Sequence, residues 1–229
     1  MYRYEKKFLI NNIQREILRN TLSAVLYLDS NIKNPDGSYF IRSLYFDDYK
    51  DTSYNQVLDG ISKREKYRIR YYDLDPSYIT LEKKSKENNL GKKDKDKLSP
   101  EMVVKLITNE EIETKKPVVS ELQAKMKADL YKPAIIIDYE RRAFTYPIND
   151  VRITIDYNIS CSYDVSNFFE RDVNSIPLLD KNMSILEVKY NDFLPDIIKQ
   201  LINIKNLEIT SFSKYATGRE MLEKIERRI

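Results

Sequence analysis

The sequence contains no histidine and very little glycine. Without histidine, Ser-His-Asp and Cys-His catalysis are excluded, and so are metal sites with imidazole ligands. The four glycines, at positions 37, 60, 91 and 218, lie too far apart to form a P-loop or a dinucleotide-binding fingerprint. Any phosphate must therefore be bound by side chains. Any metal must be held by carboxylates, which favours Mg²⁺ or Mn²⁺.

Cysteine and long apolar runs are also scarce. Cys161 is the only cysteine, which excludes an internal disulfide and a cysteine-cluster metal site. No apolar run is long enough to span a bilayer, and the first ten residues, MYRYEKKFLI, do not resemble a signal peptide. We therefore expect a cytoplasmic protein without a membrane segment.

Neither sign of charge is in large excess. The 39 Lys and Arg residues stand against 36 Asp and Glu residues, a formal net charge of +3. A generic basic nucleic-acid binder is excluded, so we expect no nucleic-acid partner, and any basic site must arise from local segregation of charge. With 229 residues, of which 41% are hydrophobic, the chain can form a substantial core, and we predict a single domain over residues 1–229.

Strands outnumber helices along the chain, which predicts an α+β fold. Period-two patterns predict strands at 2–10, 39–48, 64–73, 78–86, 132–146, 151–158 and 184–190. Apolar spacing and capping residues predict helices at 12–27, from Ser99 onwards, and at 118–130, 194–203 and 213–227. The apolar side of the first helix would carry Ile13, Ile17, Leu18, Leu22 and Val25. Residues 74–76 indicate a hairpin, and we expect the charged segment 87–98 to be a mobile loop.

The segment KREKYRIRYY, residues 63–72, places four cations on one face of a predicted strand: Arg64, Lys66, Arg68 and Arg70. Taking like charges out of water is costly unless they are paired. The strands at 78–86 and 151–157 carry similar charged faces. One interpretation is an ordinary solvated sheet face. The other is a barrel whose charged faces point inward onto a polyanion and a divalent metal.

A second pattern, Glu-x-Lys, occurs in three predicted strands, as Glu5 and Lys7, Glu82 and Lys84, and Glu187 and Lys189. The spacing of two places both members of each pair on one strand face. The third case is the most informative, because SILEVKY is an apolar strand with a single Glu and a single Lys embedded in it. Alone, the pattern arises often by chance at this charge content.

Eight segments in a fixed order carry a family resemblance. They are YEKKFLI at 4–10, IRSLYFDD at 41–48, KYRIRYY at 66–72, ITLEKKSK at 79–86, DYERRAF at 138–144, VRITID at 151–156, ILEVKY at 185–190 and SFSKYATG at 211–218. Together they resemble the VTC domain, the catalytic domain of the vacuolar transporter chaperone complex. That domain is a polyphosphate polymerase of the triphosphate tunnel metalloenzyme superfamily, which includes the CYTH proteins.

The resemblance implies a closed antiparallel β-barrel, the tunnel, with flanking helices. It implies an ATP-dependent polyphosphate polymerase, a phosphotransferase that moves the γ-phosphate of ATP onto a growing inorganic polyphosphate chain and releases ADP. It also implies a bound Mn²⁺ or Mg²⁺. Phosphoryl transfer requires mainly positioning and charge neutralisation, which arginine, lysine and a metal supply without histidine.

Specific residues follow from the motif matches. The resemblance implies catalytic contacts to the phosphates from Lys7, Arg68, Arg70, Lys84, Arg141 and Lys214. It implies further phosphate contacts from Tyr139, Arg152, Lys189 and Ser213, and from one lysine of the 92–97 cluster, for which we choose Lys95. Glu187 matches the metal-binding glutamate, and additional metal candidates are Glu5, Glu82 and Asp156. Ser211 departs from the pattern, because many polymerase members have a basic residue there.

Other functions remain open from the sequence. A hydrolase of tripolyphosphate or another triphosphate could use the same fold, and so could a non-catalytic module that senses polyphosphate or nucleotide. RNA binding is the weakest alternative. The expected partners are ATP and inorganic polyphosphate or pyrophosphate. Translocation of product would need a separate membrane protein, which would place this chain at the periphery of a membrane complex.

Overall fold

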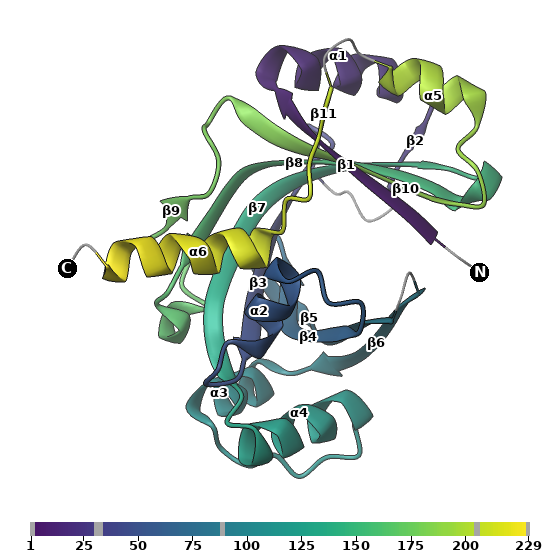
Figure 1. Cartoon of the computed structure of the whole chain (residues 1–229). Coiled ribbons are helices and arrows are strands. Elements are labelled where there is room, and N and C mark those ends of the chain that lie inside the picture. Colours follow the sequence, from purple (N-terminus) through teal and green to yellow (C-terminus); the bar gives the residue numbers. More distant parts are fainter. Residues whose placement is uncertain (1–2, 30–33, 88–89, 204–206, 228–229) are drawn as a thin grey trace. The chain divides into compact units, whose positions relative to one another are not determined.

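The computed structural model describes residues 3–29, 34–87, 90–203 and 207–227 (Figure 1). These residues form an α+β fold with antiparallel strand pairing and six α-helices, which confirms the predicted class. The chain divides into two compact units. Unit 1 comprises Met1–Phe40, Tyr139–Ile159 and Leu179–Phe212, and unit 2 comprises Ile41–Asp138, Ser160–Leu178 and Ser213–Ile229. Each is described by itself.

Unit 1 is a sheet with two helices on one face. Its strands are β1 (Arg3–Asn11), β2 (Tyr27–Leu28), β10 (Met183–Asn191) and β11 (Glu208–Ile209), with most of β8 (Val151–Ser162) and half of β7 (Lys132–Tyr146). Their hydrogen-bonding order is β11-β1-β10-β8-β7, and β2 pairs with β7. Helices α1 (Asn12–Ser23) and α5 (Asp196–Ile202) lie side by side (Figure 1). They cover a core that includes Leu18, Leu22, Ile153, Leu186, Val188 and Ile198.

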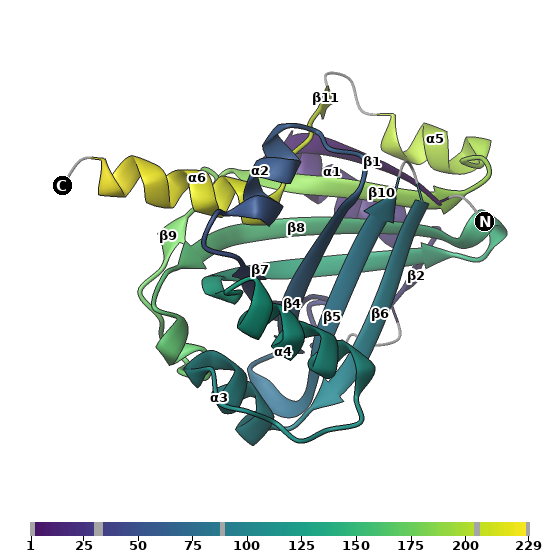
Figure 2. The ribbon, with the colours of Figure 1, turned by 60° about the horizontal axis from the view of Figure 1, so that its bottom comes forward.

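Unit 2 has its own sheet and core. Its elements are most of β3 (Tyr39–Asp47), α2 (Thr52–Leu58), β4 (Arg64–Tyr72), β5 (Asp75–Glu87), β6 (Leu90–Leu98), α3 (Pro100–Thr108), α4 (Pro117–Ala128), β9 (Ile176–Pro177) and α6 (Lys214–Glu226). The strand order is β7-β3-β4-β5-β6, and β9 pairs with the end of β8. Helix α4 packs against β5 and β6, and Figure 2 shows it beside these strands.

Period-two alternation separates the two faces of the unit 2 sheet. Tyr67, Ile69 and Tyr71 of β4 are at most 1% exposed and pack with Leu81 of β5 against the helices. Alternate residues of the same strands, including Arg68 and Arg70, therefore point to the opposite face. The apolar face thus fixes where the charged face lies.

The predicted hairpin is present as β4 and β5. Asp73 and Leu74 form its two-residue turn, with φ of 51° and 54°. Positive φ at both central residues is the geometry of a type I′ turn, whose twist matches that of the paired strands. The register shifts between Tyr72 and Arg70, and beyond this irregularity Arg68 lies opposite Glu82.

The predicted mobile loop at 87–98 is wrong for the residues described. Strand β6 runs over Leu90–Leu98 and pairs antiparallel with β5 along its length, while residues 88 and 89 lie outside the described part. Its sequence is polar, so hydrophobicity gives no strand signal. Its lysines and aspartates nevertheless alternate, and Asp96 accepts hydrogen bonds from the backbone N–H groups of Val118 and Val119, at 2.7 and 3.1 Å.

Two helical predictions also need correction. Helix α1 ends at Ser23, not at residue 27, and Leu18 and Leu22 are buried whereas Ile13 is 74% exposed. Ile17 and Val25 are likewise exposed, so the buried stripe is narrower than the apolar spacing suggests. The sequence did not predict α2. Asp47 stabilises its start, accepting from the backbone N–H groups of Ser53 and Tyr54.

The closed barrel is not formed by backbone hydrogen bonds. The strand order has two ends, β11 and β6, and no pairing between them exists among the described residues. β11 has only two residues, and β6 presents charged side chains along its length. Short or charged edge strands resist further pairing. In the part of the chain described, no helix has both the length and the apolar character needed to cross a bilayer.

Asp96 lies on strand β6 but caps the start of helix α4, so we predict that it contributes to the stability of the fold. Asp96→Ala leaves the N–H groups of Val118 and Val119 without their acceptor, and we expect about 1 kcal/mol lower free energy of unfolding in urea. Asp94→Ala is the control, since Asp94 lies on the same strand and its ion pair is with exposed Lys92. Equal effects of the two substitutions would contradict the capping role.

Candidate functional site: charged faces of the two sheets

The unit 2 basic face is the side of β4, β5 and β6 opposite the core. Cross-strand register places its members together: Lys66 opposite Lys84, Arg68 opposite Glu82, Arg70 opposite Thr80, and then Lys84 opposite Lys93, Glu82 opposite Lys95, and Thr80 opposite Lys97. Ser43 and Tyr45 of β3 lie opposite Arg70 and Arg68. The structure thus brings together the predicted residues Arg68, Arg70, Lys84 and Lys95.

Glu82 is the acidic centre of this face. Its carboxylate, 3% exposed, accepts hydrogen bonds from Arg68 Nε and Nη2 at 2.8 and 2.7 Å and forms a second ion pair with Lys93. Burial acts to raise the pKa of Glu82. The positive charges of Arg68, Arg70 and Lys93 outweigh burial and lower the pKa to about 2. Glu82 therefore stays ionised, as a counter-charge to the surrounding cations.

Tyr45 is a second acidic group on the unit 2 basic face. Its ring stacks on Tyr215 at 5.1 Å, and its hydroxyl accepts from Arg68 Nη1 at 3.0 Å. Burial acts to raise the pKa of Tyr45, but Arg68, Arg70 and Lys66 lower it from 10.0 to about 7. The phenol is thus poised to ionise near neutral pH, because the cations around it favour the phenolate.

Arg70 and Lys84 occupy different environments on this face. Arg70 is only 5% exposed, and its Nε donates to Ser43 Oγ at 2.9 Å. Lys84 and Lys95 are exposed. Arg70 is therefore held in one orientation by its surroundings, whereas the two lysines lie at the surface.

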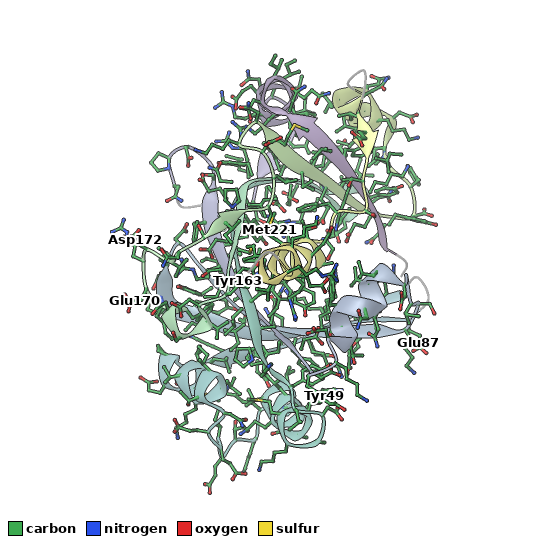
Figure 3. The ribbon with its side chains drawn as sticks, turned by 60° about the vertical axis from the view of Figure 1, so that its left-hand side comes forward. Tyr49, Glu87, Tyr163, Glu170, Asp172 and Met221 are labelled. Atoms are coloured by element: carbon green, nitrogen blue, oxygen red, sulfur yellow. The ribbon has the colours of Figure 1, made fainter. Side chains whose placement is uncertain are left out.

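The start of α6 carries Ser213 and Lys214. Ser213 Oγ accepts a hydrogen bond from the Ala216 N–H, at 3.4 Å, and so acts as the helix N-cap. Gly218 allows α6 to lie close to β7, because a Cβ there would come within 2.8 Å of Ile135 Cδ1. Tyr163, labelled in Figure 3, donates to the Gly218 carbonyl at 3.0 Å. These contacts fix the helix that positions Lys214.

The unit 1 charged face contains a quartet of two glutamates and two lysines. Register places Glu5 opposite Lys189 and Lys7 opposite Glu187 on β1 and β10. Lys7 Nζ lies 3.3 Å from Glu5 and 3.7 Å from Glu187, and Lys189 Nζ lies 3.4 Å from Glu5 and 2.5 Å from Glu187. Each lysine thus contacts both carboxylates. Burial lowers the pKa of Lys7, but Glu187 and Glu5 more than compensate and raise it.

Arg141 and Asp156 form a buried pair beside the quartet. Arg141 Nε and Nη2 donate to the two carboxylate oxygens at 2.6 and 2.7 Å, and Asp156 is fully buried. Burial acts to lower the pKa of Arg141, and Asp156 raises it well above its ordinary value. The guanidinium lies 5.3 Å from the centroid of the Tyr139 ring. The two hydrogen bonds to Asp156 fix the plane of the Arg141 guanidinium group.

Arg152 extends the unit 1 charged face along β8. It lies opposite Lys189 in the register of β8 and β10. Its Nη2 is 2.6 Å from Asp29 Oδ2 and 3.3 Å from the Tyr39 hydroxyl. The structure thus brings together Lys7, Glu187, Lys189 and Arg152, with Arg141 and Tyr139 beside them.

Unit 1 supplies only a few side-chain ligands for a divalent cation. Among the described residues, no group of three or more His, Cys, Asp or Glu side chains could hold a metal. Glu5 and Glu187 supply two carboxylates, and Thr154, opposite Glu187, has a buried Oγ1 without a hydrogen-bond partner in the described part. Mg²⁺ is commonly held by one or two carboxylates plus phosphate oxygens and water. Asp156 is engaged by Arg141 and Glu82 by Arg68, so neither is available without breaking its pair.

Several members of these faces were missed by the sequence. Tyr45, Ser43 and Asp29 became visible only through strand register and side-chain contacts. The alternation KKDKDK was a signal for Lys93 and Lys97, since it places these lysines on the face of Lys95. No sequence signal links Tyr45 to Arg68, which lies 23 positions away.

Comparison with known proteins places the chain in a family. The model of the VTC domain matches residues 2–223, and the chain belongs to that family, which confirms the resemblance in the motifs. No curated protein matches it significantly. The PH1819 protein of Pyrococcus horikoshii OT3 is similar in fold, with a TM-score of 0.50 and 12% identity over 97% of this chain and 99% of that one. A Bacillus halodurans protein provisionally assigned as an adenylate cyclase matches with a TM-score of 0.47 and 12% sequence identity. The match covers 99% of this chain and 92% of that one.

The cations around Tyr45 lead us to predict that its hydroxyl loses its proton near neutral pH. One tyrosine should ionise with an apparent pKa of about 7, followed by ultraviolet absorbance of the phenolate, and Tyr45→Phe should remove it. Because the folded-state pKa lies below the ordinary value, Tyr45 stabilises the fold fully above pH ~10, and this contribution is lost as pH falls towards about 7. Tyr49→Phe, at an exposed tyrosine, is the control. A transition retained in Tyr45→Phe would refute the assignment.

Proposed function

We propose that this chain is an ATP-dependent polyphosphate polymerase, which transfers the γ-phosphate of ATP onto a growing inorganic polyphosphate chain and releases ADP. Its family membership supports a triphosphate or polyphosphate substrate. The observation that carries the proposal is the unit 2 basic face, where Lys66, Arg68, Arg70, Lys84, Lys93, Lys95 and Lys97 share one side of three paired strands.

The spacing of the cations on the unit 2 basic face suits a chain of phosphates. Neighbouring strands lie about 4.8 Å apart, and side chains on one face recur every second residue. A linear polyanion lying across β4, β5 and β6 along the row of Lys66, Lys84 and Lys93 would therefore meet a new cation on each strand. Arginine can bind two phosphate oxygens at once and lysine adds point charge.

The transfer needs no protein nucleophile. An oxygen of the terminal phosphate of the acceptor chain attacks the γ-phosphorus of ATP, and the bond from that phosphorus to the β,γ-bridging oxygen breaks, which leaves ADP. The acceptor oxygen is already ionised near neutral pH, so no general base is required. In this proposal Arg68 and Arg70 orient phosphate oxygens on the unit 2 basic face, and Arg141 and Arg152 do so on the unit 1 charged face; such cations stabilise the charge that builds up during transfer.

We assign metal binding to Glu187, with Glu5 as its neighbour in the quartet. Mn²⁺ or Mg²⁺, when bound, would neutralise phosphate charge and stabilise the leaving group. Lys7 and Lys189 now contact both carboxylates and would redirect their ammonium groups to phosphate oxygens. A quartet with zero formal charge would thereby become a site for both cation and polyanion.

The direct test is an incubation of the purified chain with ATP, Mn²⁺ and a pyrophosphate primer, with products separated by size. We expect long chains together with ADP, and no product when the metal is removed by a chelator. Release of orthophosphate from tripolyphosphate without chain growth would assign a hydrolase instead. Binding of polyphosphate without turnover of either substrate would assign a sensing module.

Substitutions at Glu187 should separate metal dependence from folding. Glu187→Gln keeps the shape of the side chain but removes its charge, and we expect the polymerisation rate to fall roughly 100-fold or more. The apparent Mn²⁺ requirement should rise as well. Thr108→Ala, at an exposed helix position, is the control for non-specific effects of a substitution on the purified protein. A Glu187→Gln protein with an unchanged rate and Mn²⁺ requirement would disprove the metal assignment.

Removing two arginines of the unit 2 basic face should weaken polyphosphate binding. The double variant Arg68→Ala, Arg70→Ala loses two charge-assisted contacts, and we expect a dissociation constant roughly 100-fold higher, measured by titration of the folded protein. The control is Lys63→Ala, Lys92→Ala, which removes the same charge from two side chains that are largely exposed. Equal affinities of the two double variants would refute a specific role for the arginines.

A further inference from the structure

A cavity in unit 1 lies at the end of the charged face and has no role in the function proposed above. Its volume is about 490 Å³. Tyr27 and Tyr146 contribute aromatic rings to its lining, Asp29 and Asp150 contribute carboxylates, and Arg152 contributes its guanidinium. The cavity lies where β2 pairs with the end of β7, which Figure 2 shows beside each other.

We propose that this cavity binds the nucleoside part of a nucleoside triphosphate, with the base against Tyr27 and Tyr146. The proposal rests on the proposed function, because it assumes that the triphosphate part lies on the unit 1 charged face. It adds a reason why this chain would select a nucleotide over an inorganic polyphosphate as phosphate donor.

Arg152 connects the cavity to the phosphate-binding residues. It lines the cavity and, through the pairing of β8 with β10, lies opposite Lys189 of the quartet. Its Nη2 is fixed by Asp29 at 2.6 Å and by the Tyr39 hydroxyl at 3.3 Å, while the side chain stays 36% exposed. A phosphate held by Arg152 and Lys189 would therefore have the cavity next to it.

The chemistry of the lining fits a nucleoside better than another phosphate. Aromatic rings stack on bases of any sequence, since every base has a π-face. Carboxylates accept hydrogen bonds from ribose hydroxyl groups or exocyclic amino groups, but they repel phosphate. Asp29 is already paired with Arg152, and Asp150 would thus oppose the entry of a polyphosphate chain and favour a neutral, hydroxyl-bearing ligand.

The carboxylate of Asp150 is placed by a defined turn. Asn149 and Asp150 both have positive φ, 57° and 48°, directly before β8 begins at Val151. The Asn149 side-chain amide donates to the Phe193 carbonyl at 2.7 Å, which anchors this turn to the segment between β10 and α5. The backbone that carries Asp150 at the edge of the cavity is therefore held in place.

The test compares two probes on the full chain, ATP and tripolyphosphate, each titrated calorimetrically with Mg²⁺. Tyr27 is 70% exposed, so Tyr27→Ala should fold normally. We expect Tyr27→Ala to weaken ATP binding about tenfold and to leave tripolyphosphate binding unchanged. Tyr27→Phe, which keeps the ring, should bind ATP as the unaltered chain does. Tyr49→Ala, at a 61% exposed tyrosine of unit 2, is the matched control.

The possible outcomes separate this inference from the proposed function. Unchanged ATP affinity in Tyr27→Ala, or an equal loss for both probes, would overturn the nucleoside cavity and leave a triphosphate-binding protein. A Lys189→Ala variant, which leaves the buried pair of Arg141 with Asp156 intact, should weaken both probes, because Lys189 acts on the phosphates in the proposed function. If the unaltered chain bound neither probe, both the cavity assignment and the proposed function would fall.

Discussion

The arrangement of both sheets depends on a few buried or half-buried carboxylates that compensate crowded cations. In unit 2, Glu82 contacts Arg68 and Lys93, and the charges of Arg68, Arg70 and Lys93 lower its pKa to about 2 against the effect of burial. Without it, arginines on adjacent positions of one strand face would repel each other at low solvent exposure. Glu82 therefore allows the unit 2 basic face to exist before any polyanion arrives.

Unit 1 compensates its crowded cations in two separate ways. The quartet of Glu5, Lys7, Glu187 and Lys189 is neutral as a whole, and each of its ion pairs is partly exposed, so it can be rearranged at modest cost. The pair of Arg141 with fully buried Asp156 is bidentate, and breaking it would leave an uncompensated buried charge. The quartet is thus the part suited to exchange partners with substrate and metal, whereas the Arg141 pair is suited to hold one orientation.

Much of this could be predicted from period-two patterns, because alternation fixes which residues share a strand face. The strands around Arg68, Arg70, Glu187 and Arg152 are present, and the family is confirmed. Strand β6 could not be predicted, since its stability comes from pairing with β5 and from the Asp96 cap on α4, not from apolar residues. Contacts between residues distant in sequence, such as Arg152 with Asp29, depend on tertiary packing that no local pattern encodes.

The alternation in β6 shows how one strand serves two purposes with charged residues alone. Lys93, Lys95 and Lys97 point to the unit 2 basic face, and Asp94 and Asp96 point to the side covered by α4. A shift of register by one residue would place the aspartates among the cations of the unit 2 basic face and leave the first turn of α4 without an acceptor. Such a shift would be penalised on both faces at once. The charge pattern that made the segment look like a loop is therefore what specifies its position as a strand.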